Sequence, residues 1–328
     1  FQGEYKDMTP ARMKKDFIRK LNYLQACGIN AIIFQVRPEA DAFYKSDIEP
    51  WSRFFTGEQG VAPAGEFDPM AFLIQECHKR NMEFHAWLNP YRASTAGNTR
   101  FADSHIYHKH PEWFVTYNKQ ILFDPGLPES RQFICRVVRD IVGRYDVDAI
   151  HMDDYSIPIL AAGMPFPDDN SFRKYGLRKG YSEAQRNDWR RENVNTLIRE
   201  LKRTILLTNL GTLRYSPFGI YRNKKSTADG SGSNTNGLQN YDDLYADITY
   251  WVQQGWIDYN IPPDLLGDRT PGGGLHHAYQ MVGQKRQRRS FIYRARRGPH
   301  HESGPANPQD ALRACLASRE RQLFLARQ

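Results

Sequence analysis

Hydrophobic and polar residues alternate along the chain between helical periodicity and short, almost wholly apolar runs. Residues 9–28 begin with Thr9 and Pro10, carry apolar side chains at three- and four-residue spacing and end at Gly28, which predicts a helix. The next run, residues 29–36, is continuously apolar and rich in β-branched side chains, as expected of a strand buried on both faces of a parallel sheet. The same succession recurs in residues 68–81 and 82–92, and again in residues 128–145 and 147–152. Three helix-to-strand passages predict parallel βα units in a right-handed barrel or an open sheet.

The third of these strands brings two adjacent carboxylates, Asp153 and Asp154, to its carboxyl end. Side chains alternate along a strand, so one carboxylate should point toward the barrel axis and the other sideways, and we expect different roles for them. An acidic pair at the end of a parallel strand, followed at once by Tyr155, is typical of a catalytic loop in an α/β barrel. The alternative is that one aspartate caps the following loop and the other is solvated.

Polar and aromatic side chains also follow the two earlier strands and the loop after the first of them. Because the carboxyl ends of parallel strands meet at one edge of a sheet, we expect these residues near the acidic pair. The alternative for each is loop anchoring or barrel packing. The residues are Gln35, Arg37, Glu39, Asp41, Tyr44, Trp51, His85, Asn89, Tyr91 and Arg92.

The rest of the chain is less regular. Residues 182–205 predict a charged helix that begins at Ser182. Residues 214–223 stand where a fourth strand should end, residues 241–255 predict an amphipathic helix, and residues 256–262 predict a short strand with Asp258 inside it. From about residue 263 the pattern offers one short strand, 290–294, and a terminal helix, 310–326. We therefore expect a single domain over residues 1–328 with an irregular C-terminal part.

Composition limits the class of protein. The chain has 328 residues, of which 40% are hydrophobic and 13% aromatic, enough for a barrel of about 250 residues with insertions. No apolar run reaches the roughly 18 residues of a membrane span, although a lipid anchor upstream of Phe1 stays open. The net charge of +8 arises largely after Gln284. Nucleic-acid binding is not expected, since neither a recognition helix nor an RNA-binding motif is present.

The patterns that could indicate a metal are weak. His105, His108 and His110 lack the cysteine or carboxylate that would complete a known ligand spacing. Residues 229–234 resemble a calcium loop only loosely, because the terminal glutamate is missing. We expect no metal and no cofactor. Free thiols are expected at the four widely spaced cysteines, Cys27, Cys77, Cys135 and Cys315.

Several blocks of the chain resemble the glycosyl hydrolase-like 10 family of bacterial envelope proteins, which includes lipoproteins. The resemblance implies a TIM-type (β/α)8 barrel, a glycosidase activity, a place in the cell envelope and, as substrate, peptidoglycan strands stripped of their peptides. Family members have a first barrel strand upstream of Phe1, so the barrel here should lack it. Where members tend to carry a Pro-Gln and a Tyr-Trp-Glu cluster, Asp264 and Leu265 follow Pro263, so the resemblance gives no acid there. The blocks are residues 28–44, 49–60, 67–92, 148–158, 216–226 and 237–259.

Glycoside hydrolysis needs one carboxyl to protonate the leaving oxygen and another to attack or to activate water. By a weaker similarity to α-amylase-type barrels, the triplet from His151 to Asp153 makes Asp153 the nucleophile or base. The candidates for the acid are Asp154, Glu39, Asp41 and Asp258. A barrel that binds glycans without cleaving them is the alternative. In either case Tyr44, Trp51, Trp87, Tyr91 and Tyr155 are expected to stack on sugar rings, and Gln35, Arg37, Arg92 and His151 to bind hydroxyl or N-acetyl groups.

Overall fold

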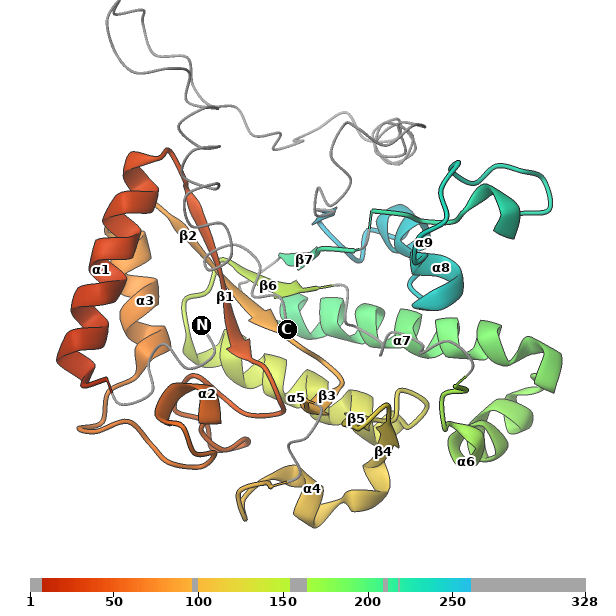
Figure 1. The fold of residues 1–328 in the computed structure, drawn as a ribbon, viewed down its shortest axis with the longest axis horizontal. Coiled ribbons are helices and arrows are strands. Elements are labelled where there is room, and N and C mark those ends of the chain that lie inside the picture. Colours follow the sequence, from red (N-terminus) through yellow and green to blue (C-terminus); the bar gives the residue numbers. More distant parts are fainter. Residues whose placement is uncertain (1–7, 96–99, 154–163, 209–211, 218, 261–328) are drawn as a thin grey trace, which may run out of the picture.

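Five parallel strands form the central sheet of the computed structural model, and their order in space follows their order in sequence (Figure 1). The structure describes residues 8–95, 100–153, 164–208, 212–217 and 219–260. A helix precedes every strand, which gives the succession of βα units that the hydrophobic pattern predicts. The strands are β1 (Ala31–Arg37), β2 (Glu83–Leu88), β6 (Ala149–Met152), β7 (Leu213–Tyr215) and β8 (Tyr259–Asn260).

The connecting helices begin where the sequence places their caps. The Thr9 hydroxyl accepts a hydrogen bond from the backbone of Arg12, and the Asp68 carboxylate accepts one from Ala71. In both helices a proline occupies the first turn, where no backbone donor is needed. The predicted helices at 9–28, 68–81, 128–145 and 182–205 are confirmed. The helices are α1 (Pro10–Ala26), α3 (Pro69–His78), α5 (Pro128–Arg144), α7 (Arg186–Leu206) and α9 (Ile248–Gln253).

Alternate side chains of the strands pack against these helices. The Phe34 ring of β1 lies edge-on to Phe17 of α1, with centroids 6.2 Å apart, and Tyr215 of β7 lies edge-on to Trp251 of α9 at 5.1 Å. Ile150 and Met152 of β6 belong to the same core. Since side chains alternate along a strand, the residues between these point to the opposite, inner face of the sheet.

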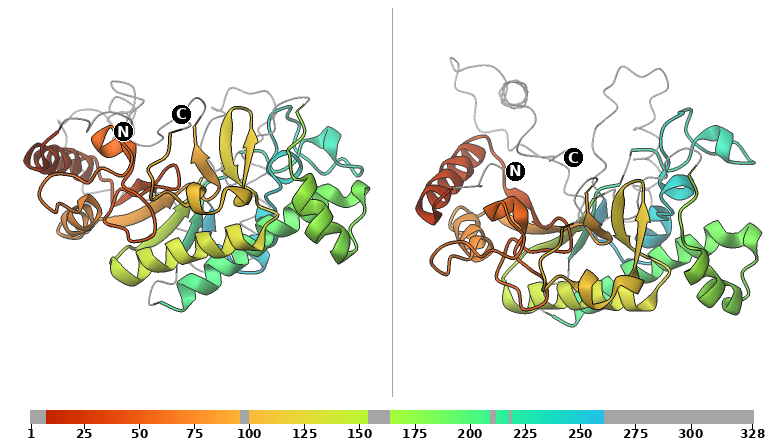
Figure 2. Two further views of the ribbon diagram at one scale, coloured as in Figure 1. Left: turned by 90° about the horizontal axis from the view of Figure 1, so that it is seen from below. Right: turned by 60° about the horizontal axis from the view of Figure 1, so that its bottom comes forward.

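Two excursions interrupt the βα repeat. After β2 the chain forms a small antiparallel sheet whose hairpin turns at Asn118 and Lys119, both with positive φ. Figure 2 shows this hairpin standing out from the central sheet. The second excursion precedes α7 and lies at the lower right of Figure 1. The first contains β3 (Arg92–Ser94), α4 (Ile106–Lys109), η1 (Pro111–Trp113), β4 (Phe114–Tyr117) and β5 (Gln120–Phe123), and the second α6 (Asp169–Ser171), the π-turn η3 (Phe172–Gly176), η4 (Leu177–Lys179) and η5 (Glu183–Gln185).

The predicted helix over residues 241–255 is wrong, because two short helices stand there, α8 (Asn240–Asp243) and α9. Tyr245 between them has φ of +54°, a left-handed conformation that no helix continues through. Asp247 then caps α9 by accepting a hydrogen bond from the backbone of Tyr250. Two further short helices lie in loops, α2 (Arg53–Thr56) and η6 (Lys224–Ser226).

Several predictions concern residues outside the described part of the chain, among them the strand at 290–294, the helix at 310–326 and Cys315. Cys27, Cys77 and Cys135 have free thiols. None of the helices in the described ranges combines the length and the apolar surface needed to cross a bilayer. The closed eight-stranded barrel stays a prediction, since the described residues form five strands of the central sheet.

Candidate active site

Asn89 and Asp153 directly follow neighbouring strands of the sheet, β2 and β6. Strands β2 and β6 pair in parallel, with Trp87 opposite His151 and Leu88 opposite Met152. The rings of Trp87 and His151 meet edge to face, with centroids 6.5 Å apart. Asn89 and Asp153 are the next residue on each strand, so continuing this register would make them neighbours, about 4.8 Å apart between strands. Asp153 is only 7% exposed and Asn89 is fully buried.

Three side chains on this face hold polar atoms that lack a hydrogen-bond partner within the described structure. They are Nε1 of Trp87, both polar atoms of the Asn89 amide and Nδ1 of His151. A buried polar group left unpaired costs about 1–3 kcal/mol, so such groups rarely gather without a ligand or water to satisfy them. The cluster is therefore a candidate binding position for water or another polar molecule at the carboxyl ends of β2 and β6.

A charged group lies deeper on the same face. His85 contacts Glu83 through Nε2, 2.8 Å from Oε2, and Arg214 of β7 contacts both residues, with Nη2 3.0 Å from Oε2 of Glu83. Burial, reinforced by the Arg214 charge, lowers the pKa of His85 to about 4. Burial together with His85 and Arg214 lowers the pKa of His151 to about 3. Both imidazoles are therefore neutral at pH 7. His85 lies two residues before Trp87, inside β2, and not at the strand tip where the sequence pattern placed it.

The predicted arginines make their contacts within the protein. Arg37 is fully buried and forms an ion pair with Glu49 at 2.7 Å. Its Nη1 also donates to the backbone oxygens of Asn89, at 2.5 Å, and Pro90, at 3.1 Å. Arg92 donates to the backbone oxygen of Pro38 at 3.1 Å. These contacts give Arg37 a positioning role, since it fixes the backbone that carries Asn89, and they argue against a direct bond to sugar hydroxyls.

Of the predicted stacking residues, Tyr44 and Tyr91 are fully buried. The Tyr44 ring packs edge-on against Tyr145, with centroids 5.5 Å apart, and burial raises the pKa of Tyr91. Their burial favours the packing alternative over contact with a sugar. Trp51 is half-buried and stacks on Phe55 at 6.0 Å. Gln35 is half-buried on the inner face of β1, opposite Trp87.

The two carboxyls that follow β1 differ in protonation. Burial alone would raise the pKa of Glu39, but hydrogen bonds from Arg53, at 2.8 Å, and Thr95, at 2.6 Å, and the Arg53 charge outweigh it and lower the pKa. Burial raises the pKa of Asp41 to about 7, with a contribution from the Glu39 charge. Glu39 is therefore a firmly ionised carboxylate, which is the wrong state for a general acid, while Asp41 holds a proton near neutral pH.

Asp258 does not belong to this site. It precedes β8, at the amino end of the strand, where it forms an ion pair with Lys202 at 2.8 Å and accepts a hydrogen bond from the Leu213 backbone at 2.7 Å. The expectation that it lies inside the strand is wrong, and its place at the amino end argues against it as one of the four candidates for the acid, since the other three follow the carboxyl ends of strands. Asp154 and Tyr155 lie outside the described residues.

The comparisons with known proteins agree with the resemblance seen in the sequence. The model of the glycosyl hydrolase-like 10 family matches residues 5–264. The chain belongs to this family. Glycosyl hydrolase YngK of Bacillus subtilis (strain 168) is 44% identical over 262 residues, which cover 78% of this chain and 50% of that protein. Glycosyl hydrolase DigH of Escherichia coli (strain K12) is 39% identical over 256 residues, which cover 75% of this chain and 56% of that protein. The chain thus spans about half the length of these two relatives.

Solved structures give weaker matches. Alpha-L-fucosidase isoenzyme 2 from Paenibacillus thiaminolyticus has a TM-score of 0.45 and 15% identity, and the match covers 67% of this chain and 31% of that one. A hypothetical protein from Ruminiclostridium thermocellum has a TM-score of 0.40 and 14% identity, and the match covers 62% of this chain and 90% of that one. The region matched by the family model, residues 5–264, contains Asn89, Asp153 and all the carboxyls considered as the acid.

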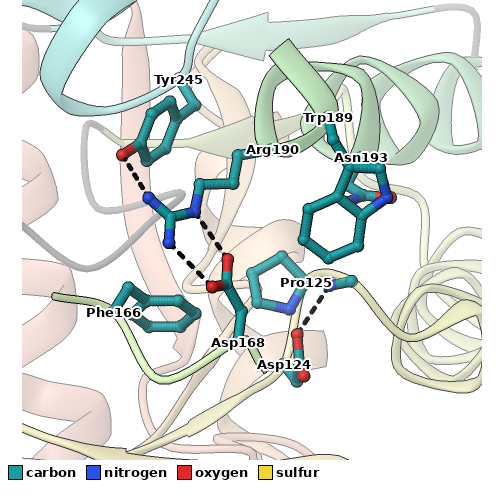
Figure 3. Close-up of a pocket in the computed structure, with 9 residues that line it drawn as sticks. Asp124, Pro125, Phe166, Asp168, Trp189, Arg190, Asn193 and Tyr245 are labelled. Atoms are coloured by element: carbon teal, nitrogen blue, oxygen red, sulfur yellow. Dashed lines mark hydrogen bonds and ion pairs between the residues drawn. The ribbon is translucent and has the colours of Figure 1, made fainter. Parts of the chain in front are cut away.

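The sequence pattern missed a second group of buried charges in this member of the glycosyl hydrolase-like 10 family. Figure 3 shows the residues that line a small pocket there, in which Arg190 holds the Asp168 carboxylate with Nε 2.6 Å from Oδ2. The Tyr245 hydroxyl accepts a hydrogen bond from Arg190 at 2.9 Å, and burial raises the pKa of Asp124 to about 6. These residues are far apart in the sequence, so no local pattern reveals them. Their contacts tie the segment before α6 to α7 and to the link between α8 and α9.

The histidine pattern has a structural explanation. His105 caps α4 by accepting a hydrogen bond from the Tyr107 backbone at 3.1 Å, and its ring stacks on Phe101 with centroids 4.3 Å apart. In the Gly/Ser-rich loop, the Asp229 carboxylate accepts hydrogen bonds from Ser231. Within the ranges that the structure describes, no three His, Cys, Asp or Glu side chains are grouped so that they could hold a metal ion.

Proposed function

We propose that this chain is the catalytic domain of a glycoside hydrolase in which Asp153 acts as nucleophile or base and Asn89 binds the sugar beside it. The observation that carries the proposal is the Asn89 amide, buried with both polar atoms unpaired, one strand away from Asp153. An amide offers one acceptor and two donors, which suits the paired hydroxyl groups of a sugar ring. The nearby Trp87 and His151 would add a further donor and a neutral imidazole.

The proposal includes a closed (β/α)8 barrel. Five parallel strands in sequence order, each preceded by a helix, are what consecutive βα units of such a barrel produce. Strands beyond these five would close the ring around the inner face. Asp153 and Asn89 then stand at the carboxyl ends of their strands, the face on which barrel enzymes carry their chemistry.

As substrate we propose bacterial cell-wall glycan, most specifically peptidoglycan strands without peptides, and as location the cell envelope. Support comes from the family and from the half-buried ring of Trp51 in the loop after β1, since aromatic faces suit sugar rings. The whole relatives are about twice as long as the matched region, so this assignment concerns the domain that the match covers.

Two carboxyls remain as the general acid, Asp41 and Asp154. Asp41 has the raised pKa that suits proton donation near neutral pH, although its oxygens accept hydrogen bonds from the Glu39 backbone and from Gln59. Asp154 directly follows the proposed nucleophile. Asp41→Asn and Asp154→Asn therefore decide between them, because loss of the acid slows substrates with poor leaving groups far more than activated aryl glycosides.

The test is chromatography of peptide-free glycan strands after incubation with the protein. The wild type should shorten the strands, Asp153→Asn should abolish turnover while strands still co-sediment with it, and Asn89→Ala should lower the rate by roughly 10²-fold. Asp146→Asn, which removes a 94% exposed carboxylate before the same strand, should leave the rate unchanged. Unshortened strands that still bind the wild type would instead establish a glycan-binding barrel without catalysis.

A further inference from the structure

Four cations are displayed together on the excursion that precedes α7. We define the basic turn as residues 172–181, which comprise η3, η4 and two following residues. Arg173, Lys174, Arg178 and Lys179 are all exposed. Leu177 between them is 45% exposed, and Tyr175 and Tyr181 are half-buried. The surface of the turn thus combines positive charge with aromatic side chains.

The positive charge of the basic turn is only partly offset by its neighbours. Within the described ranges, none of the four cations forms an ion pair with a carboxylate, and Arg173 donates to neutral acceptors, Oδ1 of Asn170 and the backbone oxygen of Asp169. The adjoining acids Asp169 and Glu183 both pair with Arg186, the latter at 2.9 Å. The Tyr175 hydroxyl donates to Glu129 at 3.4 Å. An anionic partner would therefore meet cations that are not held in ion pairs, although Asp169 lies near Arg173 and Glu129 near Lys174.

The basic turn is held rigidly from below. Phe172 is fully buried, lies edge-on to Trp189 with centroids 5.1 Å apart and is covered by the Arg186 guanidinium at 4.5 Å. A Cβ at Gly176 would lie 2.3 Å from the Phe172 ring, so only glycine fits that close approach. Ser182 and Gln185 form a capping box just beyond the turn. Because these contacts fix the backbone of the turn, a partner would not have to order that backbone on binding.

We propose that the basic turn is a docking surface for a carboxylate-bearing glycan strand, separate from the position where a bond is cleaved. This inference rests on the proposed function, since it takes the cell-wall glycan as the polymer. Peptidoglycan carries one lactyl carboxylate on every second sugar once its peptides are removed. The four cations would attract those carboxylates, and the tyrosine rings would pack against sugar faces. The turn lies at the amino end of α7, which runs back from the carboxyl ends of the strands, so one polymer could reach both places.

The experiment measures binding without turnover. All proteins carry Asp153→Asn, so the strands are not consumed. The test variant also removes the four cations of the basic turn, by Arg173→Gln, Lys174→Gln, Arg178→Gln and Lys179→Gln. The matched control instead removes four exposed cations elsewhere, by Arg12→Gln, Lys15→Gln, Lys224→Gln and Lys225→Gln. Three probes are compared by co-sedimentation or interferometry: peptide-free strands, the same strands with amidated carboxylates, and chitin oligosaccharides.

At about 50 mM salt the test variant should bind peptide-free strands about tenfold more weakly than the control, a change expected of several weak surface ion pairs. The difference should vanish on amidated strands, on chitin oligosaccharides and above roughly 0.5 M salt, where charges are screened. Equal affinities of test and control variants, an equal loss on amidated strands, or no binding of strands by either protein would overturn the proposal. So would an equal loss on double-stranded DNA, which would mark a general polyanion surface.

The two proposals fail separately. If the protein with Asp153 intact binds strands through the basic turn but never shortens them, the docking surface stands and the hydrolase assignment fails. If the protein shortens strands, and binds them equally well with and without the four cations, the hydrolase assignment stands and the docking surface fails. Thermal unfolding of each variant verifies that the fold is intact.

Discussion

The Arg53 guanidinium closes over the Glu39 carboxylate, with Nε 2.8 Å from Oε2. Glu39 is fully buried, and its other oxygen accepts a hydrogen bond from the Thr95 backbone. One carboxylate thereby joins the end of β1, the short helix α2 and the segment after β3. The ion pair fixes the loop that also carries Asp41 and Trp51.

Arg53→Met should destabilise the fold by about 2 kcal/mol, because it leaves the Glu39 charge buried without its cation. This loss is smaller than for a fully buried ion pair, since the Arg53 side chain is 30% exposed. Urea unfolding at pH 7 measures the change. Arg19→Ala removes one of the two cations paired with Asp16, from a position 68% exposed, and should cost less than about 0.5 kcal/mol. Equal losses for the two variants would contradict the role given to Arg53.

Asp41 should give stability an unusual dependence on pH. Its pKa in the folded state is raised from 3.8 to about 7, mainly by burial, so its contribution is fully present below pH 3.8 and is lost as the pH rises through 7. Asp41→Asn keeps the neutral form at every pH. Relative to the wild type, the variant should therefore gain up to about 1.4 kcal/mol per pH unit between pH 4 and 7, and nothing further above. Urea unfolding across this range tests it, with the exposed Asp103→Asn as control; parallel curves for Asp41→Asn and wild type would contradict it.

The βα repeat could be predicted because it depends on local signals. Thr9 with Pro10, and Asp68 with Pro69, mark helix starts in the sequence and cap α1 and α3 in the structure. The break at Tyr245 could not, since its left-handed backbone is held by hydrogen bonds of its hydroxyl with Arg190 and Asn187, more than fifty positions away. Tertiary contacts of this kind override a local helical pattern.

The same division applies to the candidate site. Asp153 and Asn89 could be singled out because each directly follows a buried strand, and the register of β2 and β6 then brings them together. Arg37 could not be assigned correctly, because its position at a strand end predicts ligand contact, whereas its partner Glu49 lies in a loop that folds back over it. Sequence position indicates which side chains reach the carboxyl edge of the sheet. Only the folded loops decide which of these side chains form contacts within the protein and so are unavailable to a ligand.

His151 should make the fold sensitive to acid. Its pKa in the folded state is lowered from 6.5 to about 3, chiefly by burial, so the folded protein keeps the imidazole neutral while the unfolded chain takes up a proton below pH 6.5. Stability should therefore fall by about 1.4 kcal/mol per pH unit from this group alone between roughly pH 6 and 3. His151→Asn should flatten the curve by that amount, and His108→Asn, at an exposed position, should not. Unfolding free energies at pH 7, 6 and 5 measure the slopes, and identical slopes for wild type and His151→Asn would refute the assignment.

Gly126 lies where no side chain can be added, because a Cβ there would lie 2.6 Å from Cη2 of Trp189 and 2.7 Å from Oγ of Ser171. Both neighbours are 1% exposed and have no room to move. Gly126→Ala should therefore destabilise the fold by about 2 kcal/mol through overpacking. Gly143→Ala is the matched control: it lies in α5, no atom would come within 4 Å of its Cβ, and alanine should stabilise the helix by up to about 1 kcal/mol. Thermal and urea unfolding should thus shift in opposite directions for two chemically identical substitutions, and a shift in the same direction would show that the packing around Trp189 yields.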